Sequence, residues 1–162
     1  VSVSATVRTS RRRLRIFLRC TLPTRWPISM PGCQPMSEPD SSAVPLCASD
    51  ALVERGDAFV FDVLQWRQKA TAFVMRFDGR VVAYLNRCVH VPTEMDWQEG
   101  KFLDGDREFI VCSIHGATYD PNNGRCVGGP CARGQLTALR VEEHDQQVYW
   151  YPSSDTQPAP AT

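Results

Sequence analysis

The chain has 162 residues and a formal net charge of zero, with 18 Lys and Arg residues against 18 Asp and Glu residues. This balance hides an asymmetry, because every acidic residue lies at Glu38 or later, whereas seven arginines lie before it. Residues 36–162 therefore carry 11 basic and 18 acidic residues, a net charge of −7. An acidic domain argues against a nucleic-acid-binding protein and fits docking to a basic protein face. No apolar run approaches the roughly 18 residues of a membrane span.

The two ends of the chain differ in composition from its middle. Residues 1–35 are rich in Ser, Thr, Arg and Pro and contain no acidic residue. The stretch "TSRRRLRIFLRC" faintly resembles a twin-arginine export signal, and the lack of acidic residues also fits an organelle transit peptide. Against export, arginines and prolines interrupt any apolar run of signal length. We expect a disordered or spurious extension there, with Met36 or Met30 as the working start, and a cytoplasmic protein. The tail at 152–162 is of low complexity and expected to be disordered, which leaves an ordered domain at 45–151.

The ordered part has the pattern of a small β protein. The run "AFVFDV" at 58–63 predicts a short strand. The stretch "TAFVMRFDGRVVAYLN" predicts a β-hairpin, because two alternating apolar runs are joined by Asp78-Gly79, a dipeptide favoured where both turn residues need φ > 0. On its first arm the apolar face is formed by Phe73, Met75 and Phe77.

The remaining elements are short. "EFIVC" at 108–112 predicts another strand, and "LTALRVEE" with "QQVYWY" predicts a final hairpin around His144 and Asp145. The piece "SDALVERG" gives at most two helical turns, capped by Ser49. Strands with short turns at this spacing indicate an all-β barrel or sandwich.

Two Cys/His pairs follow predicted strands. "NRCVHVP" contains Cys88 and His90, and "VCSIHGATYD" contains Cys112 and His115. Two loops at strand ends, each with one thiol and one imidazole, can converge on one metal site. These ligands suit zinc, iron–sulfur clusters or copper. Structural zinc fingers usually separate their cysteines from their histidines, whereas a [2Fe–2S] centre of the Rieske type needs two of each. A zinc-stabilised interaction module remains the non-redox alternative.

The motif resembles the Rieske signature, Cys-x-His followed by Cys-x-x-His-Gly, in its ferredoxin-type branch. Gly116 follows the second histidine, Tyr119 and Asp120 stand where many members have Tyr/Phe-Asp, and "GGP" at 128–130 stands where the family has its third loop. The resemblance covers roughly residues 46–151. It implies antiparallel sheets arranged as in Rieske iron–sulfur proteins, with cluster-binding loops at one end.

The resemblance also implies a cofactor and a ligand set. The cofactor is a [2Fe–2S] cluster, with Cys88 and Cys112 on the inner iron and His90 and His115 on the outer iron. The residues expected close to the cluster and its ligands are Val91, Gly116, Tyr119, Gly129 and Pro130.

Departures from the family pattern favour a low potential. Members in cytochrome bc complexes join the two loops by a disulfide, but the matching positions here are Thr93 and Ile114. A serine that donates a hydrogen bond to the cluster in those members is replaced by Ala117. Fewer donors to sulfur stabilise the reduced cluster less, so we expect a potential nearer about −150 mV than about +300 mV.

Two further features allow more than one interpretation. The 21 residues between His90 and Cys112 are more than the ferredoxin pattern of the family implies, and the extra residues fall in the acidic stretch "EMDWQEGKFLDGDRE" at 94–108. We interpret this stretch as a longer solvated hairpin, with a partner-docking surface as the alternative. Cys126 and Cys131 flank the third loop. In a reducing cytosol we expect two thiols, with a disulfide as the alternative.

The residue inventory indicates an electron carrier. An oxygenase catalytic domain would need a second iron held by two histidines and a carboxylate, and only His144 remains after the cluster. We expect one-electron transfer between a reductase and an oxygenase or other acceptor, with protein redox partners and no nucleic acid or membrane span. The chain would then be an oxidoreductase component and no stand-alone enzyme. An accessory subunit of a larger oxidoreductase and a redox or cluster-sensing regulator stay open.

Overall fold

The structure is a computed structural model of the chain and describes residues 42–160. The extension expected at 1–35 lies outside the described residues. The described elements, in chain order, are β1 (Val44–Ala48), the 3-10 helix η1 (Ser49–Ala51), β2 (Phe59–Gln65), β3 (Gln68–Phe77), β4 (Arg80–Leu85), β5 (Ile110–Val111), β6 (Thr118–Tyr119), β7 (Cys126–Gly128), the 3-10 helix η2 (Gly129–Cys131), β8 (Arg140–His144), β9 (Gln147–Tyr151) and β10 (Thr156–Pro158). No described helix is long and apolar enough to cross a membrane.

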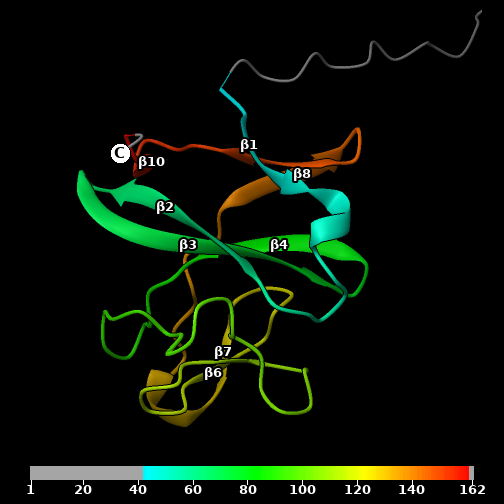
Figure 1. The fold of residues 1–162 in the computed structure, drawn as a ribbon. Coiled ribbons are helices and arrows are strands. Elements are labelled where there is room, and N and C mark those ends of the chain that lie inside the picture. Colours follow the sequence, from blue (N-terminus) through cyan, green and yellow to red (C-terminus); the bar gives the residue numbers. More distant parts are fainter. Residues whose placement is uncertain (1–41, 161–162) are drawn as a thin grey trace, which may run out of the picture. The chain divides into compact units, whose positions relative to one another are not determined.

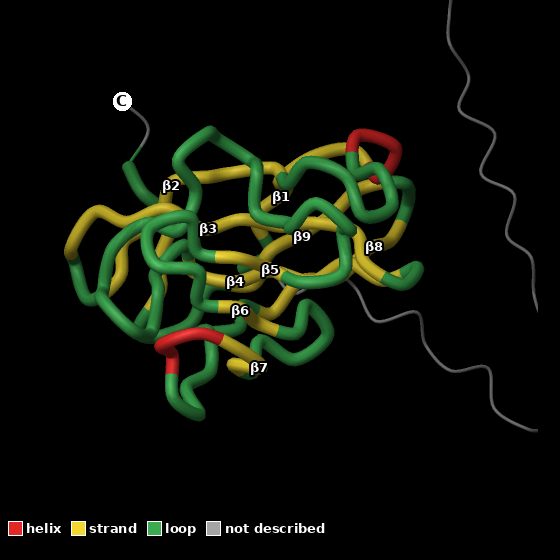
Figure 2. The backbone as a smooth tube through the Cα atoms, turned by 90° about the horizontal axis from the view of Figure 1, so that it is seen from below, coloured by secondary structure: helices red, strands yellow, loops and turns green. Residues whose placement is uncertain are grey.

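The strands of the described residues form three antiparallel sheets, in the orders β1-β9-β8, β10-β2-β3-β4 and β5-β6-β7. Figure 1 shows the β2–β3–β4 sheet in the middle, with β1 and β8 on one side and β6 and β7 on the other. The view from below in Figure 2 shows β5, β6 and β7 beside one another near the short η2 turn. The prediction of an all-β fold with antiparallel sheets is confirmed.

Strand β3 is buried on both of its faces. Phe73 and Met75 are 0% and 1% exposed and pack in one core with Tyr119 of β6. Ala72 and Val74, which point to the other face, are both fully buried and pack toward β8 and β9. The alternation predicted along the first arm of the hairpin is therefore correct. The other face is buried as well, because a second sheet covers it.

Both predicted hairpins form. Asp78 and Gly79 have φ values of 50° and 73° and join β3 to β4 as expected. The carboxylate of Glu54 accepts hydrogen bonds from both turn N–H groups, at 2.7 and 3.0 Å. The turn of the final hairpin lies at Asp145 and Gln146, one residue later than predicted, because these two residues have the positive φ values.

Two expectations for short segments were wrong. The helical piece is a single 3-10 turn, within the predicted limit of two turns, but Ser49 is not its cap, because Ser49 lies inside the turn and Ala48 occupies the N-cap position. The turn ends because Leu52 becomes extended and enters the core, where it is 4% exposed. Residues 152–160 were expected to be disordered, but Thr156 is 2% exposed and begins β10 on the edge of the central sheet. Ser153 turns the chain back by accepting the N–H of Thr156 on its hydroxyl.

Arg76 on β3 connects the central sheet to the β1-β9-β8 sheet and to the η1 turn. Its guanidinium forms two hydrogen bonds with Glu143 of β8, at 2.6 and 3.0 Å, and also donates to the carbonyls of Leu52 and Ser49. The Arg76 side chain is 18% exposed, so water screens this pair less than an open surface pair. The hydrogen bond from Arg76 is the main cause that lowers the pKa of Glu143 from its ordinary value of 4.5.

Arg76→Met should lower the free energy of unfolding by about 2 kcal/mol at pH 7, because it leaves a half-buried carboxylate and two carbonyls without their donor. A carboxyl whose pKa is lowered by folding stabilises the fold above its unfolded pKa and loses this contribution as the pH falls. The difference between variant and wild type should therefore shrink below about pH 4.5. Urea unfolding across this pH range measures it. Lys101→Met, which removes an exposed pair with Asp57, is the matched control and should cost no more than about 0.5 kcal/mol.

Candidate metal centre

The first Cys/His loop leaves β4 at residue 86 and is closed on itself by the backbone. The N–H of Cys88 donates to the carbonyl of Thr93 at 2.9 Å, which fixes the width of the loop. Cys88 is 3% exposed and points into the core, whereas His90 is exposed. Within this loop Cys88 therefore faces the core, whereas Val89, His90 and Val91 face solvent.

The second loop follows β5 and has the same arrangement. The N–H of Cys112 donates to the carbonyl of Ala117 at 2.8 Å, and the N–H of Gly116 donates to the carbonyl of Cys112 at 2.9 Å. This tight closure requires a φ of 70° at Gly116, which glycine adopts without steric cost. Cys112 is fully buried, and His115 is exposed.

The four candidate ligands form two pairs by type. The thiols of Cys88 and Cys112 lie close enough to interact with each other, and both belong to the core beneath the loops. The rings of His90 and His115 meet edge to face with centroids 5.1 Å apart. Among residues 42–160, no group of three or more His, Cys, Asp or Glu side chains surrounds one metal position. The arrangement is thus a buried thiol pair and an exposed imidazole pair, which is the division that two irons with different ligands need.

Hydrogen-bond donors surround the sulfur of Cys88. The hydroxyl of Tyr119 lies 3.3 Å from Cys88 Sγ and accepts the N–H of Val89 at 3.2 Å, so its own proton is available to the sulfur. Burial raises the pKa of the Cys88 thiol, but the hydrogen bonds that the sulfur accepts outweigh burial and lower the net pKa. These bonds come from Tyr119, from the backbone N–H groups of Val91 and His90, and from the thiol of Cys112. The site is therefore prepared to hold a thiolate.

The second sulfur and the tyrosine have raised pKa values. Burial is the main cause for Cys112, opposed by the backbone N–H groups of Ile114 and His115. Burial also raises the pKa of the Tyr119 hydroxyl, and the adjacent Cys88 raises it further. Tyr119 consequently stays protonated and able to donate at neutral pH.

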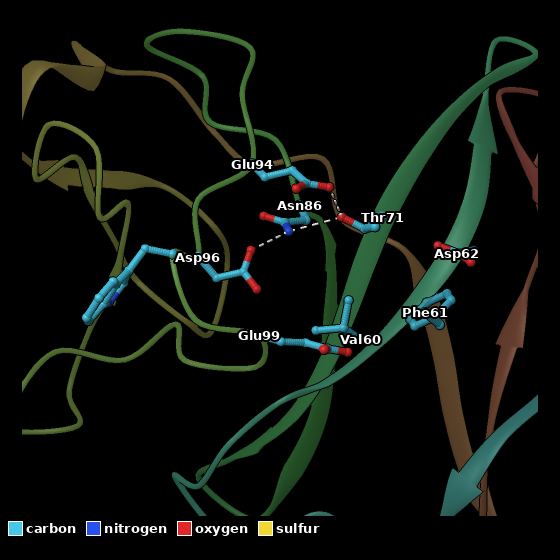
Figure 3. A pocket seen from close by; sticks show the side chains of 9 residues that line it. Val60, Phe61, Asp62, Thr71, Asn86, Glu94, Asp96 and Glu99 are labelled. Carbon is cyan, nitrogen blue, oxygen red and sulfur yellow. Dashed lines mark hydrogen bonds between the residues drawn. The ribbon is translucent and has the colours of Figure 1, made fainter.

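The segment between the two loops is anchored at Asn86, which is 4% exposed (Figure 3). Its amide nitrogen donates to Thr71 of β3 at 3.0 Å and to Asp96 at 2.7 Å, and its amide oxygen accepts the N–H of Met95 at 2.8 Å. Both the N–H and the hydroxyl of Ser113 donate to the carbonyl of Met95, at 2.8 and 2.6 Å. One buried amide thus connects the first loop, the inter-loop segment and the central sheet.

The interpretation of this segment as a solvated hairpin was wrong. Met95 and Phe102 are 0% and 1% exposed, and Phe102 stacks on Phe73 of β3 with ring centroids 3.7 Å apart. Trp97, by contrast, is 80% exposed. The extra length serves to pack two core side chains beneath the ligand loops.

The third loop covers the other two. Gly129 has a φ of 75°, and a Cβ there would clash with the carbonyl of Gly116 and lie 3.0 Å from Ala117 Cα. A Cβ on Gly134 would clash with Val89 of the first loop. Pro130 is exposed beside Gly129, in η2. The third loop therefore packs its backbone against the backbone of the second ligand loop and against the Val89 side chain of the first.

The expectation of two thiols in the third loop was wrong, because Cys126 and Cys131 form a disulfide. Their Cα atoms are 5.9 Å apart, within the usual span of such a bond. Sequence reasoning had only their spacing, which fits either state. His144, the third histidine of the chain, stacks on Tyr149 with ring centroids 4.2 Å apart in the final hairpin.

The comparisons with known proteins agree with this geometry. The family model of the Rieske [2Fe-2S] domain matches residues 42–149. The chain belongs to the Rieske [2Fe–2S] family. Its cofactor is a [2Fe–2S] cluster, and its function is one-electron transfer. No curated protein sequence matches the chain.

Solved structures of the same fold include Rieske ferredoxins. The ferredoxin of carbazole 1,9a-dioxygenase from Nocardioides aromaticivorans IC177 is 22% identical, with a TM-score of 0.55 over 70% of this chain and 100% of that chain. A chain in the complex of reduced oxygenase and oxidized ferredoxin of carbazole 1,9a-dioxygenase is 21% identical, with a TM-score of 0.53 over 69% and 94%. In a complex of a carbazole-bound oxygenase variant with ferredoxin, a chain that is 21% identical matches with a TM-score of 0.56 over 73% of this chain but only 30% of its own length. At these identities the likeness concerns the fold.

The residues present fit the cluster of the family. A Rieske [2Fe–2S] cluster takes two thiolates and two neutral imidazoles, which is the donor set that the two loops provide. Buried N–H groups and the Tyr119 hydroxyl face the cysteine pair, which suits sulfur that carries negative charge. When bound, the cluster supplies a site that gains and loses one electron, while the chain's own residues exclude water from the thiolate side.

Sequence reasoning missed the residues that hold the loops in place. Asn86 and Ser113 stand next to the ligands but read as ordinary loop residues, and Met95 lies inside an acidic stretch. A signal existed at Asn86, because asparagine side chains often hydrogen-bond to nearby backbone groups where a regular element ends.

Tyr119→Phe should lower the reduction potential of the cluster by tens of millivolts, because it removes a hydrogen bond that stabilises the more negative, reduced state. Redox titration followed by EPR measures the shift. Tyr84→Phe is the matched control, since Tyr84 is buried in the same core but its hydroxyl donates to the carbonyl of Pro121, at 2.8 Å, and not to either sulfur. The control should lose about 1 kcal/mol of stability and keep the wild-type potential. Equal potentials in all three proteins would contradict the role of Tyr119.

Proposed function

We propose that the protein is a ferredoxin-type electron carrier whose cluster is held by Cys88 and Cys112 on the inner iron and by His90 and His115 on the outer iron. The observation that carries the proposal is the contrast in exposure. The cysteines are 3% and 0% exposed, whereas both histidines reach the surface side by side. A group that exchanges electrons between proteins must come close to the partner, and in this site the imidazoles are the ligands that do.

The domain boundaries follow from this assignment. We propose a Rieske [2Fe–2S] domain at about 45–151, to which the β10 strand adds an edge of the central sheet. The family match at 42–149 supports these limits. We also propose that the protein works in the cytoplasm, the compartment expected from the sequence.

The surface around the histidines supports docking of a protein partner. Val89 and Val91 flank His90 and are 43% and 40% exposed, and Ile114 precedes His115 and is 50% exposed. Large apolar side chains in such positions leave water when a partner binds, and a small patch suits a transient redox complex. The partner proposed here is an oxygenase, with a reductase as the donor. The ferredoxin–oxygenase complexes among the structural neighbours support this choice.

The protein purified from cells should be red-brown and should become EPR-active when reduced with dithionite. His115→Cys should lower the potential or lose the cluster, because a thiolate adds negative charge to the outer iron. His144→Cys, at a histidine outside the site, is the control and should leave the spectrum unchanged. A colourless protein with one zinc per chain would overturn the proposal in favour of an interaction module. A tightly co-purifying partner would instead assign the chain as an accessory subunit.

Ile114→Glu should slow electron transfer to the oxygenase of carbazole 1,9a-dioxygenase by about tenfold, because a charge replaces an apolar contact at the centre of the interface. Stopped-flow mixing of the reduced protein with the oxidised oxygenase measures the rate, and EPR verifies an unchanged cluster. Val53→Glu is the control, because Val53 is 64% exposed but lies beside η1, away from both ligand loops. If the wild type transfers no electron to this oxygenase, the acceptor belongs to another class.

A further inference from the structure

The disulfide between Cys126 and Cys131 lies inside the loop that covers the cluster site. It joins the start of β7 to the end of η2, so it closes the "GGP" turn at 128–130 into a ring. Cys131 is 4% exposed and packs in the same core as the two candidate cysteine ligands. Neither sulfur belongs to the ligand set, so this bond is a second redox-capable group beside the cluster.

The ring is coupled to both ligand loops. Gly129, inside the ring, lies against Gly116 of the second loop, and Gly134, just after it, lies against Val89 of the first loop. The carbonyl of Cys131 accepts the N–H of Gly134 at 2.8 Å, which fixes the distance between these two contacts. Opening the ring therefore loosens two contacts at once, one on each loop.

The ring is also coupled to the donor that faces the first sulfur. In the pairing of β6 with β7, Tyr119 lies opposite Cys126, so the disulfide begins on the strand that supports Tyr119. The hydroxyl of Tyr119 reaches Cys88 Sγ at 3.3 Å. A change in the ring can therefore reach the Cys88 sulfur through two contacts, from Cys126 to Tyr119 and from Tyr119 to Cys88.

The two sulfurs differ in access. Cys126 is partly exposed and precedes Val127, which is 54% exposed, whereas Cys131 is buried. A thiolate of an external dithiol can attack the Cys126 sulfur, so that a mixed disulfide forms and Cys131 leaves as a thiolate. The second thiol of the dithiol then displaces Cys126. Two electrons pass from the dithiol to the bond, its two thiol protons end on the two cysteines, and the dithiol becomes a disulfide. In a reducing cytoplasm a disulfide is usually transient and redox-sensing.

We propose that Cys126 and Cys131 form a reversible thiol–disulfide site, reduced by a protein dithiol, whose oxidised form holds the third loop over the cluster. Reduction releases the loop, and the cluster becomes easier to lose. This inference rests on the ligand assignment and the cytoplasmic location proposed above. Under this proposal, two-electron reduction of the disulfide controls how firmly the one-electron carrier retains its cluster.

The test uses the full chain with its cluster, incubated without oxygen with or without dithiothreitol. After denaturation and alkylation with iodoacetamide, peptide masses should show Cys126 and Cys131 labelled only in the reduced sample, and Cys47 labelled in both. In parallel, a ferrous-iron chelator should bleach the visible absorption of the cluster on the order of tenfold faster after reduction. The reason is that reduction opens the ring, so that the disulfide no longer restrains the third loop.

Cysteine variants distinguish the effect of opening the disulfide from a direct attack of dithiothreitol on the cluster. The double variant Cys126→Ser, Cys131→Ser should bleach at the fast rate with and without dithiothreitol, whereas Cys47→Ser should behave as the wild type. Acceleration of the double variant by dithiothreitol would show that the reductant attacks the cluster directly and would overturn the proposal.

Three other results would also overturn it, namely labelling of both cysteines without reductant, a bond that resists dithiothreitol, and equal bleaching rates. A coloured protein with equal rates would leave the electron-carrier proposal intact. A colourless protein would overturn both proposals.

Discussion

The structure depends on the burial of two neighbouring sulfurs that must carry negative charge. A charged group in an apolar interior is costly unless donors compensate it, and two adjacent thiolates also repel each other. The donors are backbone N–H groups of the two short closed loops. Those of residues 90 and 91 donate to the sulfur of Cys88, and those of residues 114 and 115 donate to the sulfur of Cys112. The donors come from the backbone, so they depend on loop shape more than on side-chain identity.

Loop shape in turn depends on anchors outside the ligand motif. Asn86 connects the first loop to the central sheet and to the inter-loop segment, and Ser113 connects the second loop to the carbonyl of Met95. Phe102 stacks on Phe73, which places the segment on the buried face of β3. Both ligand loops are therefore held in place by contacts that lead back to β3, the central strand that is buried on both faces.

Sequence reasoning predicted those features that depend on neighbouring residues. The Asp78-Gly79 hairpin follows from turn chemistry, and the Cys/His spacing indicates the kind of centre. What it missed depends on distant partners. The burial of Met95 and Phe102 is visible only once β3 lies opposite them, and the pairing of Thr156–Pro158 depends on the free edge of β2. The state of Cys126 and Cys131 depends on how the third loop folds back, which spacing alone does not decide.

The buried cysteines and exposed histidines also separate two tasks that would otherwise conflict. Groups that adjust the stability of the reduced state, such as Tyr119, act from the protein side, where water is excluded and a hydrogen bond has its full effect. Groups that recognise a partner, such as Val91 and Ile114, lie on the solvent side beside the imidazoles. The ligands stand between the Tyr119 hydroxyl and these apolar side chains, so a partner can bind and leave without contacting that hydroxyl. The third loop is the exception, since it contacts both ligand loops and also presents Val127 to solvent. A control that acts on the cluster without occupying the docking surface is therefore most effective in that loop, which is where the disulfide lies.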